Sequence, residues 1–339
     1  MKCLVTGATG FIGNRLVEEL LKLGNEVHIL ARSKEKVSQL FGNKVTFFGG
    51  DLWDLDVIND ATRNCDAVFH LAAFANIWSK DKMLAYKTNV IGTKNILDAA
   101  LQNKVKKVVF TSSAAVFPPS ENGEEIDETA ALPEKYMTDY ETTKVQAEQL
   151  CLEYCRKGLE VVIVNPPRVF GPGLLNKSNS VTILIKKYIV GNWRIIPGTG
   201  SAIGNYVLIE DVVNGHILAM KNGISGEKYI LGGTNISFNG FFEMISTVSE
   251  KNYRLFHLPF PFILGVSKLE LFLAETTGKK PLITPPWAKK YLQNRPVSSK
   301  KAMNDLNYTV TPLDEGIGKT IEWLKTEQKW KIKRLRTTH

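Results

Sequence analysis

The stretch Thr6-Gly7-Ala8-Thr9-Gly10-Phe11-Ile12-Gly13 decides the fold. It follows a short apolar run, Lys2–Val5, that predicts a buried strand, and it precedes Arg15–Leu23, whose apolar spacing predicts a helix. Glycines at this turn permit a close approach of the backbone to a pyrophosphate and close packing of the helix on the strand. The helix N-terminus then offers N–H groups and a positive dipole end to phosphates. A glycine triad alone would indicate only a turn, but between a strand and a helix it predicts a dinucleotide site.

Strand and helix patterns alternate through the first half of the chain. Further strands are predicted at Glu26–Ala31, Val45–Phe48, Ala67–Leu71, Val108–Ser112 and Val161–Val164. The longest helical stretches between them are Lys82–Leu101 and Thr138–Lys157. This alternation predicts an α/β fold, a Rossmann-type doubly wound parallel sheet with helices on both faces.

After residue 170 the regular alternation of strand and helix patterns gives way to clusters of Gly and Pro. These clusters lie at residues 171–173, 197–200 and 232–233. Val207–Met220 looks like a return to the first domain as a short strand and a helix, and Lys228–Leu231 would add one more strand. We therefore expect a dinucleotide-binding domain of residues 1–170 and 205–232. A smaller, interleaved C-terminal substrate-binding domain would comprise residues 171–204 and 233–325, followed by a basic tail at 326–339.

The bulk composition is that of an ordinary globular protein, with 339 residues of which 44% are hydrophobic and 23% charged. The net charge is +9, but the basic residues are scattered apart from Lys325–Arg336, which favours a solvated tail over a lipid-binding arm and gives no support for a nucleic-acid partner. The four cysteines, at 3, 65, 151 and 155, lack the spacing of a metal site or a redox pair. We expect no metal and a reduced, cytoplasmic compartment. The first strand starts at residue 2, so no signal peptide is expected.

The sequence also bears on membrane contact. No window supplies the ~18 apolar residues that a membrane-spanning helix needs. The nearest, Leu255–Ala274, is interrupted by His257, two prolines, Lys268 and Glu270, and predicts a loop followed by an amphipathic helix. Peripheral contact with a membrane is the less favoured alternative for this segment.

The end of the second predicted strand bears on the choice of cofactor. An acidic residue there binds the ribose 2′-hydroxyl of NAD, whereas a nearby arginine accommodates the 2′-phosphate of NADP. Here the strand closes with Leu30-Ala31-Arg32-Ser33-Lys34, without an acid. We expect NADP(H) rather than NAD(H), with Arg32 at the 2′-phosphate and Ser33, Lys34 or Lys36 assisting. Asp51 is placed either to accept from the adenine amino group or to cap a helix.

Tyr140 and Lys144 stand four residues apart on a predicted helix, and hence on one face. This spacing alone is expected about once by chance, but the fifth strand ends in the hydroxyls of Thr111, Ser112 and Ser113, at the sheet edge where such folds bind ligands. Reduction of a carbonyl by hydride needs a proton donor, and a tyrosine of ordinary pKa near ~10 donates reluctantly. A nearby ammonium and a positively charged nicotinamide lower that pKa.

Several segments of the chain resemble those of a known family, and over residues 1–220 they stand in the same order as in that family. The matching segments are Thr6–Gly13, Asp51-Leu52, His70–Ala73, Asn89–Thr93, Thr111–Val116, Tyr140–Lys144, Asn165–Gly173 and Asn205–Ala219. The chain resembles the extended short-chain dehydrogenase/reductase superfamily of the epimerase/dehydratase type. Within it, the chain is most similar to dihydroflavonol-reductase-like and 3β-hydroxysteroid-dehydrogenase-like members.

The resemblance implies roles for particular residues. Tyr140 would be the proton donor, Lys144 its activator, Ser113 the hydroxyl that polarises the substrate (Ser112 being the weaker choice), and Asn89 a structural or proton-relay residue. Pro166 or Pro167 would border the nicotinamide. The implied cofactor contacts are Gly7, Thr9, Gly10, Phe11, Ile12, Gly13, Arg32, Lys36, Asp51, Leu52, Leu71, Ala72, Ala73, Thr111, Tyr140, Lys144 and Pro166. One departure, Val116-Phe117-Pro118-Pro119 where many sugar-acting relatives carry tyrosine and glycine, weakens a nucleotide-sugar assignment.

Three functions follow as expectations. The first is an NADP(H)-dependent oxidoreductase that interconverts a ketone and a secondary alcohol on a mainly apolar small-molecule substrate. Residues that could line its pocket, although a place in the apolar core is the favoured interpretation of each, are Phe117, Trp193, Tyr206, Phe256 and Phe260. The second is a nucleotide-sugar epimerase or dehydratase with tightly bound NAD, in which Arg168, Lys186, Lys187 or Arg194 would meet the diphosphate. The third is a non-catalytic NADP-sensing protein. The resemblance also implies a homodimer through the helices near 82–101 and 138–157.

Overall fold

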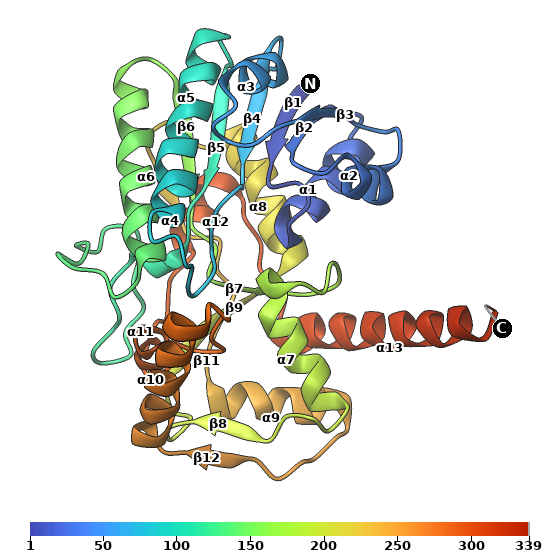
Figure 1. Ribbon diagram of the computed structural model, residues 1–339, viewed down its shortest axis with the longest axis vertical. Helices are drawn as coiled ribbons and strands as arrows, with labels where there is room; N and C mark the ends of the chain where they lie inside the picture. Colours follow the sequence, from blue (N-terminus) through green and yellow to red (C-terminus); the bar gives the residue numbers. More distant parts are fainter. Residues whose placement is uncertain (338–339) are drawn as a thin grey trace.

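The centre of the molecule is a seven-stranded parallel sheet (Figure 1). The computed structural model describes residues 1–337, with the side chains of all but Lys177 and residues 328–337. The strands lie in the order β10-β6-β5-β4-β1-β2-β3. Their bounds are β1 Lys2–Thr6, β2 Glu26–Ala31, β3 Thr46–Gly49, β4 Ala67–His70, β5 Lys107–Thr111, β6 Glu160–Val164 and β10 Lys228–Tyr229.

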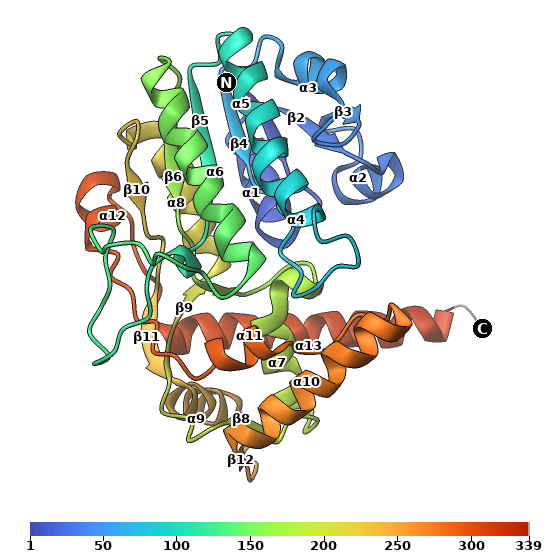
Figure 2. The same ribbon diagram turned by 60° about the vertical axis from the view of Figure 1, so that its left-hand side comes forward.

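Helices cover both faces of this sheet (Figure 2). Side chains alternate between the faces, so Cys3 and Val5 of β1 join the apolar core on one side and Leu4 joins the core on the other. The first face is covered by α1 (Phe11–Lys22), α2 (Lys34–Phe41) and α8 (Ile209–Asn222), and the second by α3 (Leu55–Thr62), α5 (Gly92–Gln102) and α6 (Asp139–Arg156). Burial on both faces explains why the strands read as continuous apolar runs.

The predicted doubly wound sheet is therefore confirmed, and its seven strands have ends within two residues of those predicted. The short strand expected at Val207 is different, because β9 (Ile203–Leu208) starts earlier and belongs to a separate three-stranded sheet. Two helices differ in detail. The first begins at Phe11 rather than Arg15, so the last glycine of the turn already lies in its first turn. The stretch predicted as one helix over 82–101 comprises α4 (Leu84–Tyr86), a π-helical turn η1 (Lys87–Ile91) and α5.

A second set of elements lies at the carboxyl edge of the sheet. It contains a three-stranded sheet in the order β11-β9-β7 and a two-stranded parallel sheet of β8 and β12. Its elements are β7 Arg168–Phe170, α7 Ser180–Ile189, β8 Ile195–Pro197, β9 Ile203–Leu208, β11 Thr234–Ser237, α9 Phe238–Ser249, β12 Phe256–Leu258, α10 Phe260–Thr277 and α11 Pro285–Lys290, with short 3-10 turns η2 Ala114–Val116 and η3 Lys177–Asn179. A separate apolar core that includes Tyr188, Phe241 and Ile317 holds this part together.

The end of the chain contributes to both parts. Helix α12 (Lys300–Leu306) returns to the sheet, where Ala302 and Leu306 join the core beneath α8. Helix α13 (Leu313–Thr337) buries Ile317, Ile321 and Leu324 in the second core and then runs out of the body (Figure 1). The expected basic tail therefore continues helix α13 over residues 326–337, because the helical spacing of these three buried side chains begins the helix before the tail. Residues 338–339 lie outside the described residues.

No helix among residues 1–337 combines the length and the apolar character that crossing a bilayer requires. The segment Leu255–Ala274, expected to form a loop and an amphipathic helix, comprises the short strand β12 and most of α10.

Candidate active site

The glycine turn between β1 and α1 is shaped for close approach. Gly7 has φ 73°, and a Cβ atom on it would lie 2.7 Å from the backbone nitrogen of Ala72. A Cβ atom on Gly13 would lie 2.3 Å from the Gly7 carbonyl oxygen. Helix α1 begins after Gly10 with no side-chain cap, so the N–H groups of its first turn, which holds Phe11 and Ile12, are available to an anion. These features fit a bound dinucleotide pyrophosphate.

A chain of hydrogen bonds ties this turn to the neighbouring strand end. Ala72 N donates to Thr6 Oγ1 at 3.2 Å, and Thr6 Oγ1 lies 2.6 Å from His70 Nδ1. On its other side, His70 Nε2 lies 3.0 Å from Thr93 Oγ1, which donates to the Asn89 carbonyl. Burial lowers the pKa of His70 to about 3, with Lys144 as a further cause. The ring is therefore neutral, and it holds the backbone after β4 beside the glycine turn.

Arg32 directly follows β2 (Glu26–Ala31) and is open to solvent. Its side chain is 82% exposed, and Nη1 lies 3.8 Å from Asp51 Oδ2. Asp51 does not cap the following helix, because α3 starts after Asp54; its Oδ1 instead accepts from Leu52 N at 2.8 Å. Ser33 caps α2 by accepting from Lys36 N, and the Lys36 side chain is exposed.

Three chemical groups predicted from the sequence come together at the carboxyl edge of β5. Burial raises the pKa of the Tyr140 phenol, and the neighbouring Ser113 side chain lowers it in part through hydrogen bonding. Lys144, one turn along α6, is buried and donates from Nζ to the Thr111 carbonyl at 2.7 Å. Burial lowers the pKa of Lys144 to about 8, although Glu148 opposes the shift. Ser112 Oγ is instead buried without a partner among the described residues, so Ser113 is the hydroxyl that faces Tyr140.

Asn89 lies in the π-helical turn and fixes the pocket wall. Its Oδ1 accepts from Phe74 N at 2.7 Å, while its Nδ2 donates to the Phe74 carbonyl and to Thr143 Oγ1. Thr143 lies between Tyr140 and Lys144 on α6. Asn89 therefore joins the segment after β4 to the helix that carries both candidate catalytic side chains.

The start of α6 is fixed by a buried ion cluster that the sequence analysis missed. Thr138 and Glu141 form a capping box, in which Thr138 N donates to the Glu141 carboxylate at 3.1 Å and Glu141 N donates to Thr138 Oγ1 at 3.3 Å. The other carboxylate oxygen lies 2.6 Å from Lys290 Nζ and 3.4 Å from Arg295 Nη2. The Thr-x-x-Glu spacing was a visible signal for the cap, but nothing in the sequence marked the partners 149 and 154 residues away.

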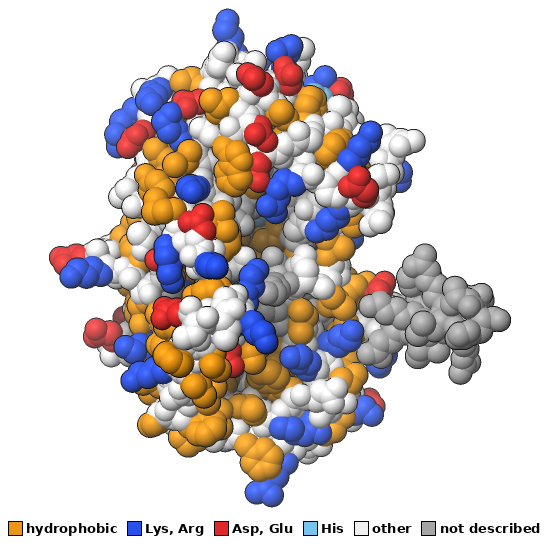
Figure 3. Space-filling model, viewed as in Figure 1, with side chains coloured by type: hydrophobic (Ala, Val, Ile, Leu, Met, Phe, Trp, Pro, Cys, Tyr) orange, Lys and Arg blue, Asp and Glu red, His pale blue; other side chains and the backbone are white. Residues whose placement is uncertain are grey.

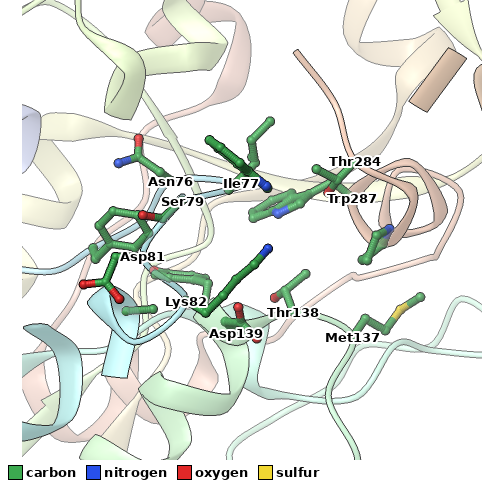
Figure 4. A pocket seen from close by; sticks show the side chains of 15 residues that line it. Asn76, Ile77, Ser79, Asp81, Lys82, Met137, Thr138, Asp139, Thr284 and Trp287 are labelled. Carbon is green, nitrogen blue, oxygen red and sulfur yellow. The ribbon is translucent and has the colours of Figure 1, made fainter. Parts of the chain in front are cut away.

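A cavity of about 140 Å³ adjoins Tyr140 (Figure 4). Trp287 of α11 stands on one side of it, Thr138 and Asp139 at the start of α6 on the other, and Lys82 between them. Its lining residues are Phe74, Asn76, Ile77, Trp78, Ser79, Asp81, Lys82, Ala85, Met137, Thr138, Asp139, Tyr140, Thr284, Pro286 and Trp287. Two tryptophans and several aliphatic side chains give it an apolar wall, and Lys82 is the one basic side chain among its described lining residues.

Other candidate residues lie elsewhere. Phe117 and Tyr206 are buried in apolar cores, Phe256 is exposed, and Trp193 and Phe260 are half-buried outside the cavity lining. Arg168, Lys186, Lys187 and Arg194 also stand outside that lining. Arg168 donates to Tyr206 Oη at 2.8 Å between two aromatic rings, and Arg194 lies over the Tyr253 ring.

Other backbone groups border the candidate catalytic cluster. The Pro166 carbonyl accepts from Ala114 N at 3.0 Å, which places it beside the strand end that carries Ser113. Thr111 Oγ1 lies 2.9 Å from His216 Nε2 of α8, so the strand end is supported from the opposite face of the sheet.

Comparisons with known proteins identify the family and the fold. Residues 3–232 match the model of the NAD dependent epimerase/dehydratase family. The chain is 30% identical to a putative dihydroflavonol 4-reductase of Synechocystis sp., over 95% of this chain and 94% of that protein. It is 28% identical to 3beta-hydroxysteroid-dehydrogenase/decarboxylase isoform 1 of Arabidopsis thaliana, over 94% and 79%. The structure of UDP-glucose 4-epimerase from Thermotoga maritima shares the fold, with a TM-score of 0.80 at 22% identity, covering 97% and 100% of the two chains.

Proposed function

Since the chain belongs to the NAD dependent epimerase/dehydratase family, we propose that it is an NADP(H)-dependent reductase, or the reverse dehydrogenase, for a mainly apolar ketone or secondary alcohol. Its family and relatives make it an NAD(P)-dependent oxidoreductase that acts on CH–OH groups. The proposal adds the cofactor, the substrate class and the residue roles.

One observation supports the proposal: Tyr140 lines a cavity with an apolar wall, has Ser113 as a hydrogen-bond partner, and lies one helical turn from the buried Lys144. Bound nicotinamide nucleotide supplies the hydride for reduction of the carbonyl carbon, or accepts it in the reverse reaction. Tyr140 carries the matching proton. Because burial raises the pKa of this phenol, Tyr140 holds its proton near neutral pH and can give it to the carbonyl oxygen as negative charge develops there.

The neighbouring residues prepare that transfer. The Ser113 hydroxyl holds the substrate oxygen in line with Tyr140. The charged Lys144 favours the phenolate that proton transfer leaves behind. Asn89 holds the pocket wall against α6 through its hydrogen bonds to Phe74 and Thr143. The nicotinamide end of the cofactor would be bordered by Thr111, Pro166 and the segment Leu71–Ala73. The glycine turn, from Gly7 through Thr9 and Gly10 to Gly13, would hold the pyrophosphate.

The chemistry of the cavity favours an apolar substrate over a nucleotide sugar. A nucleoside diphosphate needs cationic side chains around its two phosphates. The four cations considered for that role stand outside the cavity lining, and Arg168 and Arg194 are held against aromatic rings. Trp78 and Trp287 instead offer apolar surface to a ring system.

The cofactor preference is tested by titrating the nucleotide-free protein with NADPH and NADH, following nicotinamide fluorescence. We expect tighter binding of NADPH. Arg32→Ala should lower the ratio of NADPH to NADH affinity by roughly tenfold or more, because a charge-assisted contact with the 2′-phosphate is lost. Lys22→Ala is the control, because Lys22 is an exposed cation in the last turn of α1, away from the glycine turn. An unchanged ratio in Arg32→Ala, or NADH binding as tightly as NADPH, would contradict the assignment.

The substrate class is tested with a panel of apolar ring ketones and, separately, nucleotide sugars. NADPH oxidation should follow addition of the ketones. Epimerisation of a nucleotide sugar, together with NAD that co-purifies and resists stripping, would instead establish the alternative reaction on this scaffold.

The proposal includes a homodimer across α5 and α6 and a cytoplasmic location. Sedimentation of the purified chain should give twice the monomer mass, and cell fractionation followed by immunoblotting would test the location. A monomer at micromolar concentration would remove the dimer from the proposal.

A further inference from the structure

Helix α10 exposes an apolar face that the protein itself does not cover. Phe262, Val266, Leu269 and Leu273 recur at spacings of four, three and four, so they form one stripe along the helix. Phe272 flanks this stripe. The exposed fractions are 60% for Phe262, 58% for Leu269 and 62% for Phe272. The buried residues of the helix are Ser267 and Ala274, which are small and lie on the opposite face.

This face continues beyond the helix. Phe256 of β12 is exposed just before it, and Leu282, in the turn after it, is 87% exposed. Figure 3 shows hydrophobic side chains gathered over α10 and β12, with Lys and Arg side chains beside them. An apolar patch of this kind, rimmed by charge, is typical of a surface that meets a partner protein or a membrane.

The charge around the patch selects between these partners. Residues 251–290 contain seven Lys or Arg and two Glu. The net charge of this segment is therefore more than half of the chain's net charge of +9. Lys290 is buried against Glu141, but Lys268, Lys279 and Lys280 are exposed on or directly after α10. Two copies of so basic a surface would repel each other, whereas anionic headgroups would be attracted while acyl chains receive the apolar side chains.

The patch lies next to the candidate active site. Helix α10 packs against α11, and the loop between them leads to Thr284, Pro286 and Trp287 in the cavity wall. A substrate dissolved in the lipid would therefore reach the cavity beside α10.

We propose that the apolar face of α10, flanked by Lys268, Lys279 and Lys280, docks on an anionic lipid surface. This docking goes beyond the proposed oxidoreductase function and stands on the exposed face and its charge alone.

The experiment is flotation of the full chain with large unilamellar vesicles. One set contains phosphatidylcholine alone and the other an equal mixture of phosphatidylcholine and phosphatidylglycerol. Wild type should float with the anionic vesicles and much less with the neutral ones. The triple variant Phe262→Gln/Leu269→Gln/Phe272→Gln should bind at least about tenfold more weakly, because each lost side chain removes apolar burial. The variant Lys268→Gln/Lys279→Gln/Lys280→Gln should bind on the order of 100-fold more weakly.

A matched control separates this face from apolar exposure in general. Leu23→Gln/Leu55→Gln/Ile224→Gln changes three comparably exposed side chains on the sheet half and should float like wild type. Thermal melting and NADPH binding confirm that each variant is folded, and they report separately on the proposed function. Wild type that stays unbound to anionic vesicles, or an α10 triple variant that floats like wild type, would overturn the proposal. So would sedimentation showing that the α10 triple substitution dissociates a dimer, since the occupant would then be a second copy.

Discussion

The sheet half and helix α10 of the covering part use apolar residues in opposite ways. In the sheet, strands β1, β4, β5 and β6 place their apolar side chains in two cores that the chain itself completes. Helix α10 is also rich in apolar residues, but Phe262, Leu269 and Phe272 are exposed. The difference teaches that the sheet's form follows from its own sequence, whereas the form of α10 makes sense only with a surface outside the chain.

The two halves meet at the start of α6. Tyr140 faces the candidate reaction site, and the next residue, Glu141, binds Lys290 and Arg295 of the covering part. The proposed proton transfer therefore depends on Tyr140, and the packing of the two halves depends on its neighbour Glu141. Substituting one residue at a time can separate the two effects.

The largest effect should come from Tyr140→Phe. Loss of the proton donor should lower kcat for ketone reduction by roughly 10²–10⁴-fold, while NADPH affinity and the melting temperature stay near wild type. Steady-state kinetics with NADPH and a responsive ketone measure this, and nicotinamide fluorescence is the control. Turnover within a few-fold of wild type would remove Tyr140 from the chemistry.

Glu141→Gln should weaken the connection between the halves. Gln can keep the capping box, but it leaves the buried Lys290 and Arg295 charges without their carboxylate, which costs about 3–5 kcal/mol of the free energy of unfolding. Urea denaturation measures the change. Glu315→Gln is the control, because Glu315 pairs with the exposed Lys319 on α13 and its loss should be undetectable. A change as small as that of the control would mean that the two halves associate without this ion cluster.

Acid should weaken the sheet half through two buried histidines. Burial lowers the pKa of His70 to about 3 and that of His216 to about 4. The unfolded chain takes up these protons first as pH falls below about 6.5, so stability is complete above that pH and is lost progressively down to about pH 4 and below. Each histidine should remove about 2 kcal/mol of the free energy of unfolding between pH 7 and pH 5.

Urea unfolding at the two pH values measures this loss. In His216→Gln, the difference in the free energy of unfolding between pH 7 and pH 5 should be smaller by the contribution of one histidine, about 2 kcal/mol. A His257→Gln control should keep the wild-type difference, because His257 is exposed. If His216→Gln kept the full pH dependence, the loss of stability would have another origin.

The sequence predicted the sheet half well because its signals are local. Glycines at a strand–helix turn and apolar runs bounded by turns lie within a few residues of what they specify. The same holds for Tyr140, Lys144 and Ser113, which the fold brings to one strand edge as expected. The covering part carries no such signals. Trp287 reaches the cavity, and Lys290 reaches Glu141, only through the path of the chain after residue 233, which no spacing encodes. The π-helical turn was missed for a related reason, since the Asn89 bonds that accompany it lead to Phe74 and Thr143.

That turn has a consequence for how the site can change. By accepting from Phe74 N and donating to the Phe74 carbonyl, the Asn89 amide imitates one rung of a β-ladder, so the segment after β4 is held as if a strand ran beside it. These two hydrogen bonds are made to the main chain of Phe74 and do not involve the side chains of residues 75–79. Substitutions of the lining residues Ile77 and Trp78 should therefore change the shape of the cavity without breaking the attachment of Phe74 to Asn89.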